Sequence, residues 1–596
     1  MVRIRLLGPP TIERDGRAVR PPRGGKSWAL LSYLLLAERP PSRTHLAELL
    51  FTEANDPLGA LRWTLAELRR VLGPSVVLTG DPVTATLGPD VSVDVLDVGL
   101  LESGPLESGL LESGGDLLDG VQVQRCPEFE SWLLVARHRV SAAVEAALHE
   151  TAVALLASGR AKEAVPYAAR AVAGNQLDEG NHELLVRCLA AAGDKAAALR
   201  QVAACEDILR RELGVTPSAA LRDAADAGSA AVAEGGRAAA LSQLEAGRAA
   251  IMAGAVDAGI DCLRRAVDYA ARAGESTVHA RALGALGGAL VHAARGRDEE
   301  GAVVLHEAIA VATAAGERET SAMAHREIGY VDVQAGRRRT ADAWLAKAQE
   351  LAATDAEVAA VLGVRGMNAS DSGDYPSAFS YLSESVERAM RGGDSRQQAW
   401  SLSIVARCHL LRGERSQATA SLGRSLELIR EQRWIAFLPW PQALRAEVDL
   451  IGGDLDDAAD GLEQAWVLAR QLGDPCWEGM AARGKGLLHA RRGDRSAAAT
   501  WLDNARVICG RVSDRYQWVH GYVLDAAITT ALDHDDHDRA RPLVDRLATL
   551  AARCDMRELV VRAHLHRSRL GDATASAAAR LLAADIDNPA LADLLR

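Results

Sequence analysis

The clearest indication of a chemical function in this sequence comes from arginines that recur with helical spacing. They lie between Pro57 and Gly73, where a proline at the first helical position and a glycine after the last one predict a helix. One face of that helix is a leucine stripe, and the other carries Arg62, Trp63, Arg69 and Arg70. Guanidinium groups hydrogen-bond to phosphates and to guanine edges. The pattern predicts a surface that binds double-stranded DNA, and the alternative is a solvated helix face.

Two more basic residues, Lys26 and Arg43, join the predicted DNA-binding set because each begins a shorter predicted helix. Residues 1–75 contain twelve Lys or Arg against seven Asp or Glu, a net charge of +5. Residues 76–130 contain one Arg and eleven acids, a net charge of −10, and the whole chain has −12. This asymmetry favours a nucleic-acid surface confined to the start of the chain.

Gly25-Lys26-Ser27 resembles the end of the phosphate-binding loop Gly-x4-Gly-Lys-Ser, which would imply a nucleotide cofactor. The first glycine of that motif is replaced by Arg20, and the next two residues, Pro21 and Pro22, have no amide N–H to donate to a phosphate. The segment is therefore predicted to be a basic turn near the DNA backbone, and no cofactor is predicted.

Other kinds of chemistry find little support in the sequence. No Ser/His/Asp arrangement, paired carboxylates or glycine-rich cofactor loop stands out, so no catalytic residue is predicted and the chain is not expected to be an enzyme. The segment His534–Asp538 has metal-ligand residue types, but it occupies a predicted turn where polar residues are expected, so no metal site is predicted. Eight cysteines without a Cys-x-x-Cys pair, no signal-peptide core and no long apolar run indicate a cytoplasmic protein outside the membrane.

A second candidate surface is aromatic. Most tryptophans recur at equivalent repeat positions and are expected in repeat cores, but Trp434, Phe437 and Trp440 cluster around Pro439 in a predicted linker. They are predicted to be exposed and to line a groove for a protein partner or a small-molecule signal. Core packing is the alternative.

The elements that must position the basic residues lie within the first ninety residues, which alone carry strand patterns. The predicted strands are Arg3–Leu7, Thr11–Arg14, Arg17–Val19, Val76–Leu78 and Thr84–Leu87, and the predicted helices are Lys26–Ala37, Arg43–Leu50 and the one that Pro57 opens. A small sheet, three helices and a closing hairpin predict an α+β winged helix-turn-helix.

The rest of the chain repeats with a period of about 40 residues. Turn glycines recur at Gly296, Gly336, Gly373, Gly413, Gly453 and Gly493. Each is followed after five residues by a small side chain, then by a leucine, then by another small side chain, all on one helical face. This pattern predicts stacked helical hairpins of the tetratricopeptide type from about residue 130 onward, a mainly α chain.

Several motifs resemble the Streptomyces antibiotic regulatory protein (SARP) family. The start of the chain is similar to that family's OmpR-like DNA-binding domain in Leu6-Leu7-Gly8-Pro9, Gly24-Gly25-Lys26 and Leu61-Arg62-x6-Arg69-Arg70-x-Leu72-Gly73. The next segment resembles its bacterial transcriptional activator domain in Leu117-Leu118-Asp119-Gly120, Phe129-Glu130-x-Trp132-Leu133, Ala190-Ala191-Ala192-Gly193 and Glu212-Leu213-Gly214-Val215-x-Pro217-Ser218. The resemblance implies activation from promoter DNA, contact with RNA polymerase and a possible homodimer. The NTPase module that many long members insert before their repeats is not found.

These observations predict three domains: a winged helix at 1–92, an activator domain at 93–235 and a tetratricopeptide array at 236–596. The predicted function is a DNA-binding transcriptional activator whose repeats sense a partner or ligand. The alternative is a tetratricopeptide adaptor whose winged helix is only a structural cap. Three near-identical Leu-Glu-Ser-Gly tetrads, Leu101–Gly104, Leu106–Gly109 and Leu111–Gly114, are predicted to form an acidic connector, with a polymerase contact as the minority view.

Overall fold

The computed structural model describes residues 1–37, 39–97, 115–123, 125–226 and 236–596. The tetrads of the predicted acidic connector lie outside the described residues. The chain divides into two compact units. The first contains Met1–Ala147 and Asp572–Leu581, and the second contains Leu148–Gly571 and Leu582–Arg596.

The first unit begins with a small mixed sheet in the order β3-β2-β1-β6. Its strands are β1 (Val2–Arg5), β2 (Thr11–Arg14), β3 (Arg17–Ala18) and β6 (Val91–Val93). The first three pair antiparallel, as the predicted hairpins require, whereas β6 pairs parallel to β1. Side chains of β1 alternate between buried and exposed, so the sheet covers the core with one face. The sheet therefore continues to Val93, past the residue where the predicted domain ends.

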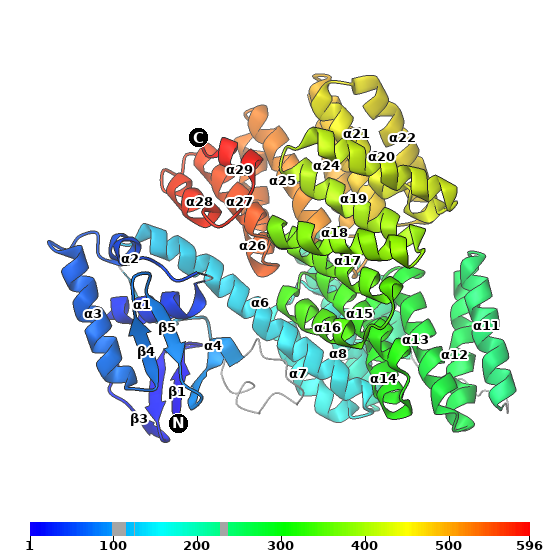
Figure 1. The fold of residues 1–596 in the computed structure, drawn as a ribbon, viewed down its shortest axis with the longest axis horizontal. Coiled ribbons are helices and arrows are strands. Elements are labelled where there is room, and N and C mark those ends of the chain that lie inside the picture. Colours follow the sequence, from blue (N-terminus) through cyan, green and yellow to red (C-terminus); the bar gives the residue numbers. More distant parts are fainter. Residues whose placement is uncertain (38, 98–114, 124, 227–235) are drawn as a thin grey trace. The chain divides into compact units, whose positions relative to one another are not determined.

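Three helices and a hairpin follow, as predicted (Figure 1). They are α1 (Gly25–Leu36), α2 (Arg43–Leu50), α3 (Pro57–Leu72), β4 (Val76–Thr79) and β5 (Thr84–Leu87), with the short α4 (Asp94–Asp97) after β6. The side chain of Ser42 accepts a hydrogen bond from the His45 N–H and caps α2, and Asp56 caps α3 in the same way. Gly73 ends α3 with a φ of 75°, a conformation that a side chain would strain.

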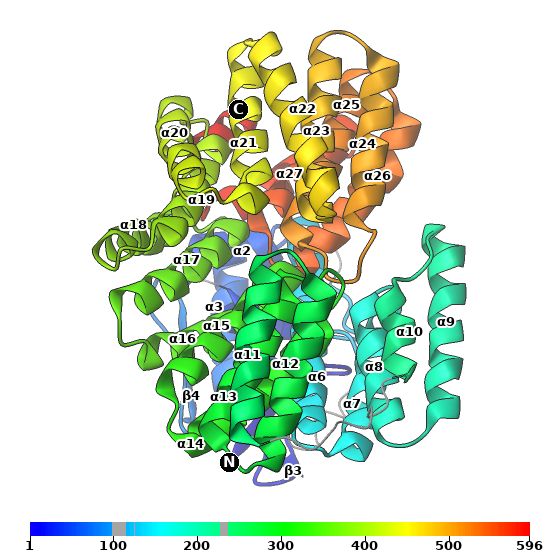
Figure 2. The same cartoon turned by 90° about the vertical axis from the view of Figure 1, so that its right-hand side faces the viewer.

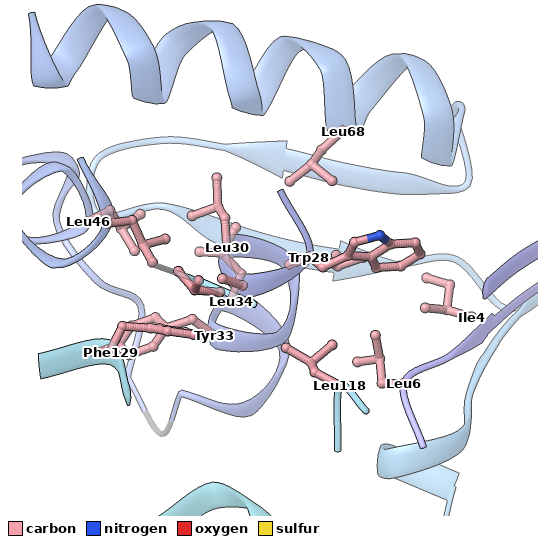
Figure 3. Close-up of a cluster of buried hydrophobic side chains, with 14 of the residues drawn as sticks. Ile4, Leu6, Trp28, Leu30, Tyr33, Leu34, Leu46, Leu68, Leu118 and Phe129 are labelled. Carbon is pink, nitrogen blue, oxygen red and sulfur yellow. The ribbon is translucent and has the colours of Figure 1, made fainter. Parts of the chain in front are cut away.

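The core of the first unit also contains residues well beyond the predicted end of the winged helix. Leu118 and Phe129 are fully buried among residues of β1, α1 and α2 (Figure 3). Phe129 lies near the start of the long helix α6 (Pro127–Ala157), and the next aromatic on that helix, Trp132, has its ring 4.7 Å from the ring of Tyr33. Residues that resemble the activator domain thus complete the core of the winged helix.

The second unit consists of helical hairpins. Its helices after α6 are α7 (Ala161–Gly174), α8 (Glu179–Ala191), α9 (Lys195–Leu213), α10 (Ala219–Asp226), α11 (Arg237–Met252), α12 (Val256–Arg272), α13 (Ser276–His292), α14 (Asp298–Ala315), α15 (Arg318–Ala335), α16 (Arg338–Leu351), α17 (Asp355–Ser372), α18 (Tyr375–Arg391), α19 (Ser395–Leu411), α20 (Arg415–Glu431), the 3-10 turn η1 (Ile435–Phe437), α21 (Pro439–Gly452), α22 (Leu455–Leu472), α23 (Pro475–Arg491), α24 (Arg495–Cys509), α25 (Gln517–Asp533), α26 (His537–Arg553), α27 (Arg557–Arg569) and α29 (Pro589–Leu594). The helix between the last two, α28 (Ala575–Ala583), lies mostly in the first unit. The predicted mainly α, tetratricopeptide-type architecture is confirmed (Figure 2).

Small residues allow the paired helices to approach closely, as the repeat pattern predicts. A side chain added at Gly287 would lie 2.6 Å from Leu305, and one added at Gly329 would lie 2.8 Å from Leu345. The repeat leucines are buried: Leu305, Leu345, Leu382, Leu422, Leu462 and Leu502. The turn glycines have positive φ, so the repeated spacing fixes both the turn and the packing that follows it.

The compact units divide the chain differently from the predicted domains. The predicted activator domain, residues 93–235, is shared between them, because residues up to Ala147 belong to the first unit and Leu148 begins the second. Helix α6 crosses that division. Among the described helices it is also the one with the length and hydropathy of a membrane span, and half of its most apolar stretch is buried inside the protein.

Candidate nucleic-acid interface

The exposed face of α3 carries the predicted basic and aromatic side chains. The side chains of Arg62 and Arg70 are 63% and 70% exposed, and Trp63 is 57% exposed. The leucine stripe of the opposite face is buried in the core, and this burial fixes the rotation of the helix about its axis. Asp56 accepts a long hydrogen bond of 3.3 Å from Arg62, an exposed pair that a phosphate can replace at little cost.

Arg69 contacts both solvent and the wing, which is the hairpin formed by β4 and β5. Its Nε donates a hydrogen bond of 2.8 Å to the carbonyl oxygen of Leu78 on β4. This bond spans from the last turn of α3 to the hairpin that follows it. Arg69 therefore helps to position the wing, while the residue as a whole remains exposed.

Arg43 holds the tip of the same hairpin. Its backbone N–H donates to Oδ1 of Asp81 at 2.9 Å, and its Nε donates to the carbonyl oxygen of Gly80 at 3.0 Å. Gly80 and Asp81 form the tip of the β4–β5 hairpin. The start of α2 and the end of α3 thus both hold the wing, through Arg43 and Arg69.

Lys26 contacts different parts of the first unit. It is half-buried, with its ammonium group 5.4 Å from the ring centre of Phe51. It also lies near Cys126, whose thiol pKa is raised by burial while the charge of Lys26 opposes that rise. These contacts give Lys26 a structural position beside the start of α6. Lys26 thus contacts other residues than Arg43 and Arg69 do, which both bond to the β4–β5 hairpin.

Arg23 is a neighbour of α3 that spacing along the chain does not reveal. Its backbone N–H donates to Oε1 of the buried Glu67 at 3.0 Å, and the same carboxylate oxygen lies 4.0 Å from Arg70. The exposed side chain of Arg23 therefore extends from a turn held against α3. The contact joins residues 44 positions apart, so no local pattern carries it.

The predicted aromatic groove requires a correction. Phe437 and Trp440 are only 5% and 2% exposed, and Trp434 is partly buried. Phe437 stacks on Trp434 with ring centres 4.5 Å apart, and Trp440 lies 5.2 Å from Trp477 on α23. The residues that break the repeat spacing fold into η1 and the start of α21, where their rings fill the space between hairpins. They form core instead of an exposed groove.

The segment His534–Asp538 forms the turn between α25 and α26 and the first two residues of α26. The side chain of Asp536 accepts a hydrogen bond from the Arg539 N–H at 3.2 Å and caps α26. This is the role that polar residues usually have at a helix start.

Comparison with known families matches two parts of the chain. Residues 104–227 match the model of the bacterial transcriptional activator domain, and residues 248–328 and 362–443 match the model of anaphase-promoting complex subunit 5. No curated protein matches the chain.

Several solved structures resemble parts of the fold. A Rap protein complexed with competence and sporulation factor is 15% identical, with a TM-score of 0.41 over 60% of this chain and 88% of its own. Mycobacterium tuberculosis EmbR, in complex with a low affinity phosphopeptide, is 18% identical, with a TM-score of 0.30 over 38% of this chain and 64% of its own. Aspartyl phosphate phosphatase F from Bacillus subtilis is 11% identical, with a TM-score of 0.37 over 68% of this chain and 92% of its own.

At these scores the structural likenesses carry no functional assignment. The chain therefore combines a segment that matches the bacterial transcriptional activator domain with tetratricopeptide-like helical repeats, and this combination is similar to a SARP-type activator with C-terminal repeats.

Proposed function

We propose that this protein is a transcriptional activator that binds promoter DNA through α3 and the β4–β5 wing. The observation that carries the proposal is the outer face of α3. Arg62, Trp63 and Arg70 are exposed there, on a helix whose opposite face is fixed in a core. A rigid helix with outward arginines fits the major groove, where arginine forms bidentate hydrogen bonds with guanine.

The wing supports the same interface. Arg43 holds its tip and Arg69 holds β4, so it is positioned relative to α3 before any DNA arrives. Preorganisation of this kind reduces the conformational entropy that binding would otherwise cost. Arg23, held beside Arg70 by Glu67, adds a charge for the phosphate backbone.

The other two parts of the chain have proposed roles that follow from the family. The activator domain contacts RNA polymerase and supports a homodimer on the promoter. The repeats sense a partner protein or a small molecule, because stacked hairpins present a continuous surface. A protein of this kind works in the cytoplasm and uses no cofactor.

The test measures affinity of the full-length protein for a fluorescent fragment of its own promoter, at two salt concentrations. Arg62→Ala and Arg70→Ala are each expected to weaken binding by about 1–3 kcal/mol, and each phosphate contact removed should reduce the salt dependence. Arg17→Ala is the matched control, since Arg17 is an exposed arginine of the same unit on β3.

Two results would argue against the proposal. Salt-independent or undetectable binding by the wild type would favour the adaptor, in which the winged helix is a structural cap. Equal affinity in Arg62→Ala, Arg70→Ala and Arg17→Ala would remove α3 from the interface while leaving DNA binding itself in place.

A further inference from the structure

Trp63 differs from every other tryptophan of this protein in its exposure. The structure describes all eleven tryptophans, and ten of them are buried or half-buried. Trp63 alone is exposed, with 57% of its surface accessible to solvent. It forms no hydrogen bond, ring contact or cation–π contact with any residue that the structure describes. Because tryptophan is highly buried on average, a free and exposed ring indicates a partner outside the chain.

The exposed apolar side chains of the first unit are concentrated on the elements proposed to bind DNA. Among its described residues, the large hydrophobic side chains that are exposed are those of Met1, Leu58, Trp63, Val77 and Leu134. Two of these five residues belong to α3, and Val77 belongs to β4 of the wing. The proposed DNA-binding surface is therefore partly apolar as well as basic.

The polar side chains of α3 other than its arginines face the core. They are Thr64 and Glu67, and both are buried. The hydroxyl of Thr64 donates to the carbonyl oxygen of Ala60 at 2.9 Å, and Oε1 of Glu67 accepts from the backbone N–H of Arg23 at 3.0 Å. Neither side chain is therefore available to a ligand outside the helix.

The outer side of α3 consequently consists of apolar and cationic residues. Arg62, Ala66 and Arg70 follow one another at intervals of four residues, and Trp63 precedes Ala66 by three, so these four share one side of the helix. All exposed residues of α3 are of the two kinds: Leu58, Arg62, Trp63, Ala66, Arg69 and Arg70.

Base edges in the major groove require different side chains for each base. Arginine bonds to guanine, asparagine or glutamine to adenine, and an acidic side chain to cytosine, whereas apolar side chains contact the C5 methyl group of thymine. The exposed side of α3 has the first and the last of these kinds and neither of the others. It is therefore equipped for guanine through its arginines and for thymine through Trp63 and Ala66.

The charges around Trp63 favour DNA over a protein surface as the partner. The side chains of Arg62 and Arg70, on the same side of the helix, are 63% and 70% exposed. The two acidic residues beside them are engaged, because Asp56 caps α3 and Glu67 is buried. An apolar ring flanked by cations fits a groove that has a phosphate backbone along each edge.

We propose that Trp63, with Ala66 on the same side of α3, contacts thymine C5 methyl groups in the major groove and makes the protein prefer thymine at those positions. The proposal rests on the DNA-binding function proposed above, and it names a base that the same face selects. A methyl group packed against the indole ring is removed from water together with part of the ring, and this burial adds affinity. Uracil pairs as thymine does but lacks the methyl group, so it should lose that gain.

The experiment measures affinity of the full-length protein for two versions of a fragment of its own promoter. Amplification with deoxyuridine triphosphate in place of thymidine triphosphate removes the methyl groups, while the phosphates and the base pairing remain. The wild type should bind the uracil fragment at least about fourfold more weakly, since burial of one methyl group is worth about that factor. Equal affinity for the two fragments would overturn the proposal and leave the DNA-binding function in place. No binding to either fragment would overturn both.

Substitutions of Trp63 assign the effect to its ring. Trp63→Ala should bind the thymine fragment no better than the uracil fragment, because the coupling between ring and methyl group is lost. Trp63→Phe keeps an apolar ring without an N–H group and should still prefer the thymine fragment. A preference that persists in Trp63→Ala would overturn the proposal. A preference lost in Trp63→Phe would also overturn it, because the indole N–H would then be the group that bonds to DNA.

Two further variants are controls. Arg62→Ala should weaken binding to both fragments and still prefer thymine, because it removes a charge and no methyl contact. Leu134→Ala changes an apolar residue of α6 that is 45% exposed, and it should bind both fragments as the wild type does. Loss of the thymine preference in Leu134→Ala would show that the preference does not depend on α3, which contradicts the proposal.

Thermal melting without DNA separates recognition from folding. Because its ring is exposed, Trp63→Ala should melt at the same temperature as the wild type. A clearly lower melting temperature would mean that Trp63 stabilises the fold, which contradicts the proposed role.

Discussion

At the scale of single residues, Arg62 and Arg69 of α3 have different roles. Arg69 donates to Leu78 of the wing, whereas Arg62 is largely exposed. Arg69→Ala should therefore lower both DNA affinity and the unfolding free energy, the latter by about 1 kcal/mol for the lost hydrogen bond. Arg62→Ala should lower affinity alone. Urea unfolding beside promoter binding checks this, and equal stability of the two variants would contradict the role given to Arg69.

Aromatic residues of the array give a second prediction at this scale. Trp440 is almost fully buried against Trp477, so Trp440→Ala should destabilise the second unit by about 3–5 kcal/mol. Trp434→Ala should cost clearly less, because Trp434 is partly exposed at the edge of the cluster. Chemical unfolding followed by circular dichroism measures both. A cost near zero for Trp440→Ala would restore the idea of an exposed aromatic groove.

The sequence could predict the exposure of a side chain where contacts within one helix determine it. It could not predict burial that depends on residues far apart along the chain. The exposure of Arg62 and Trp63 follows from the leucine stripe of their own helix. The burial of Phe437 depends on stacking with Trp434 inside η1 and on Trp477 from the next hairpin, which no spacing along the chain expresses. The contact of Arg23 with Glu67 is hidden for the same reason.

Between elements, the most informative contact joins helices of the activator-domain segment to the repeats within the second unit. His149 of α6 lies 2.7 Å from Glu299 of α14, and both are buried. Arg187 of α8 approaches Glu300, the neighbouring residue on α14, at 3.7 Å. Sequence patterns predicted these helices but placed them in separate domains, because a polar contact across 150 residues has no local pattern.

Removing Glu299 tests that junction. Glu299→Ala leaves the buried His149 without its partner and should destabilise the second unit by about 3–5 kcal/mol. Glu427→Ala, which removes an exposed pair with Arg424, is the control and should change stability by less than about 1 kcal/mol. Similar unfolding midpoints for the two variants would show that the junction contributes little to folding.

For the whole molecule, the helical repeats and the winged helix were predictable because each depends on local periodicity. The division into compact units was not predictable, since it falls inside α6 and assigns Asp572–Leu581 to the first unit.

A chain that ends at residue 235 keeps the predicted DNA-binding face but loses Glu299, the buried partner of His149. It should therefore bind promoter DNA without responding to the native signal, and should unfold more easily than the full chain. A reporter assay and thermal melting measure the two effects, and loss of DNA binding would assign the repeats a structural role.

Promoter binding through α3 is the central claim, and occupancy in the native cell tests it most directly. Tagged wild-type protein should be enriched at a defined set of promoters when its genome-wide DNA occupancy is measured. The Arg62→Ala/Arg70→Ala double variant, at equal abundance, should lose that enrichment, because it removes two exposed guanidinium groups from the proposed recognition helix. Arg17→Ala should retain it. Absence of promoter enrichment in the wild type, or enrichment that persists in the double variant, would contradict the account.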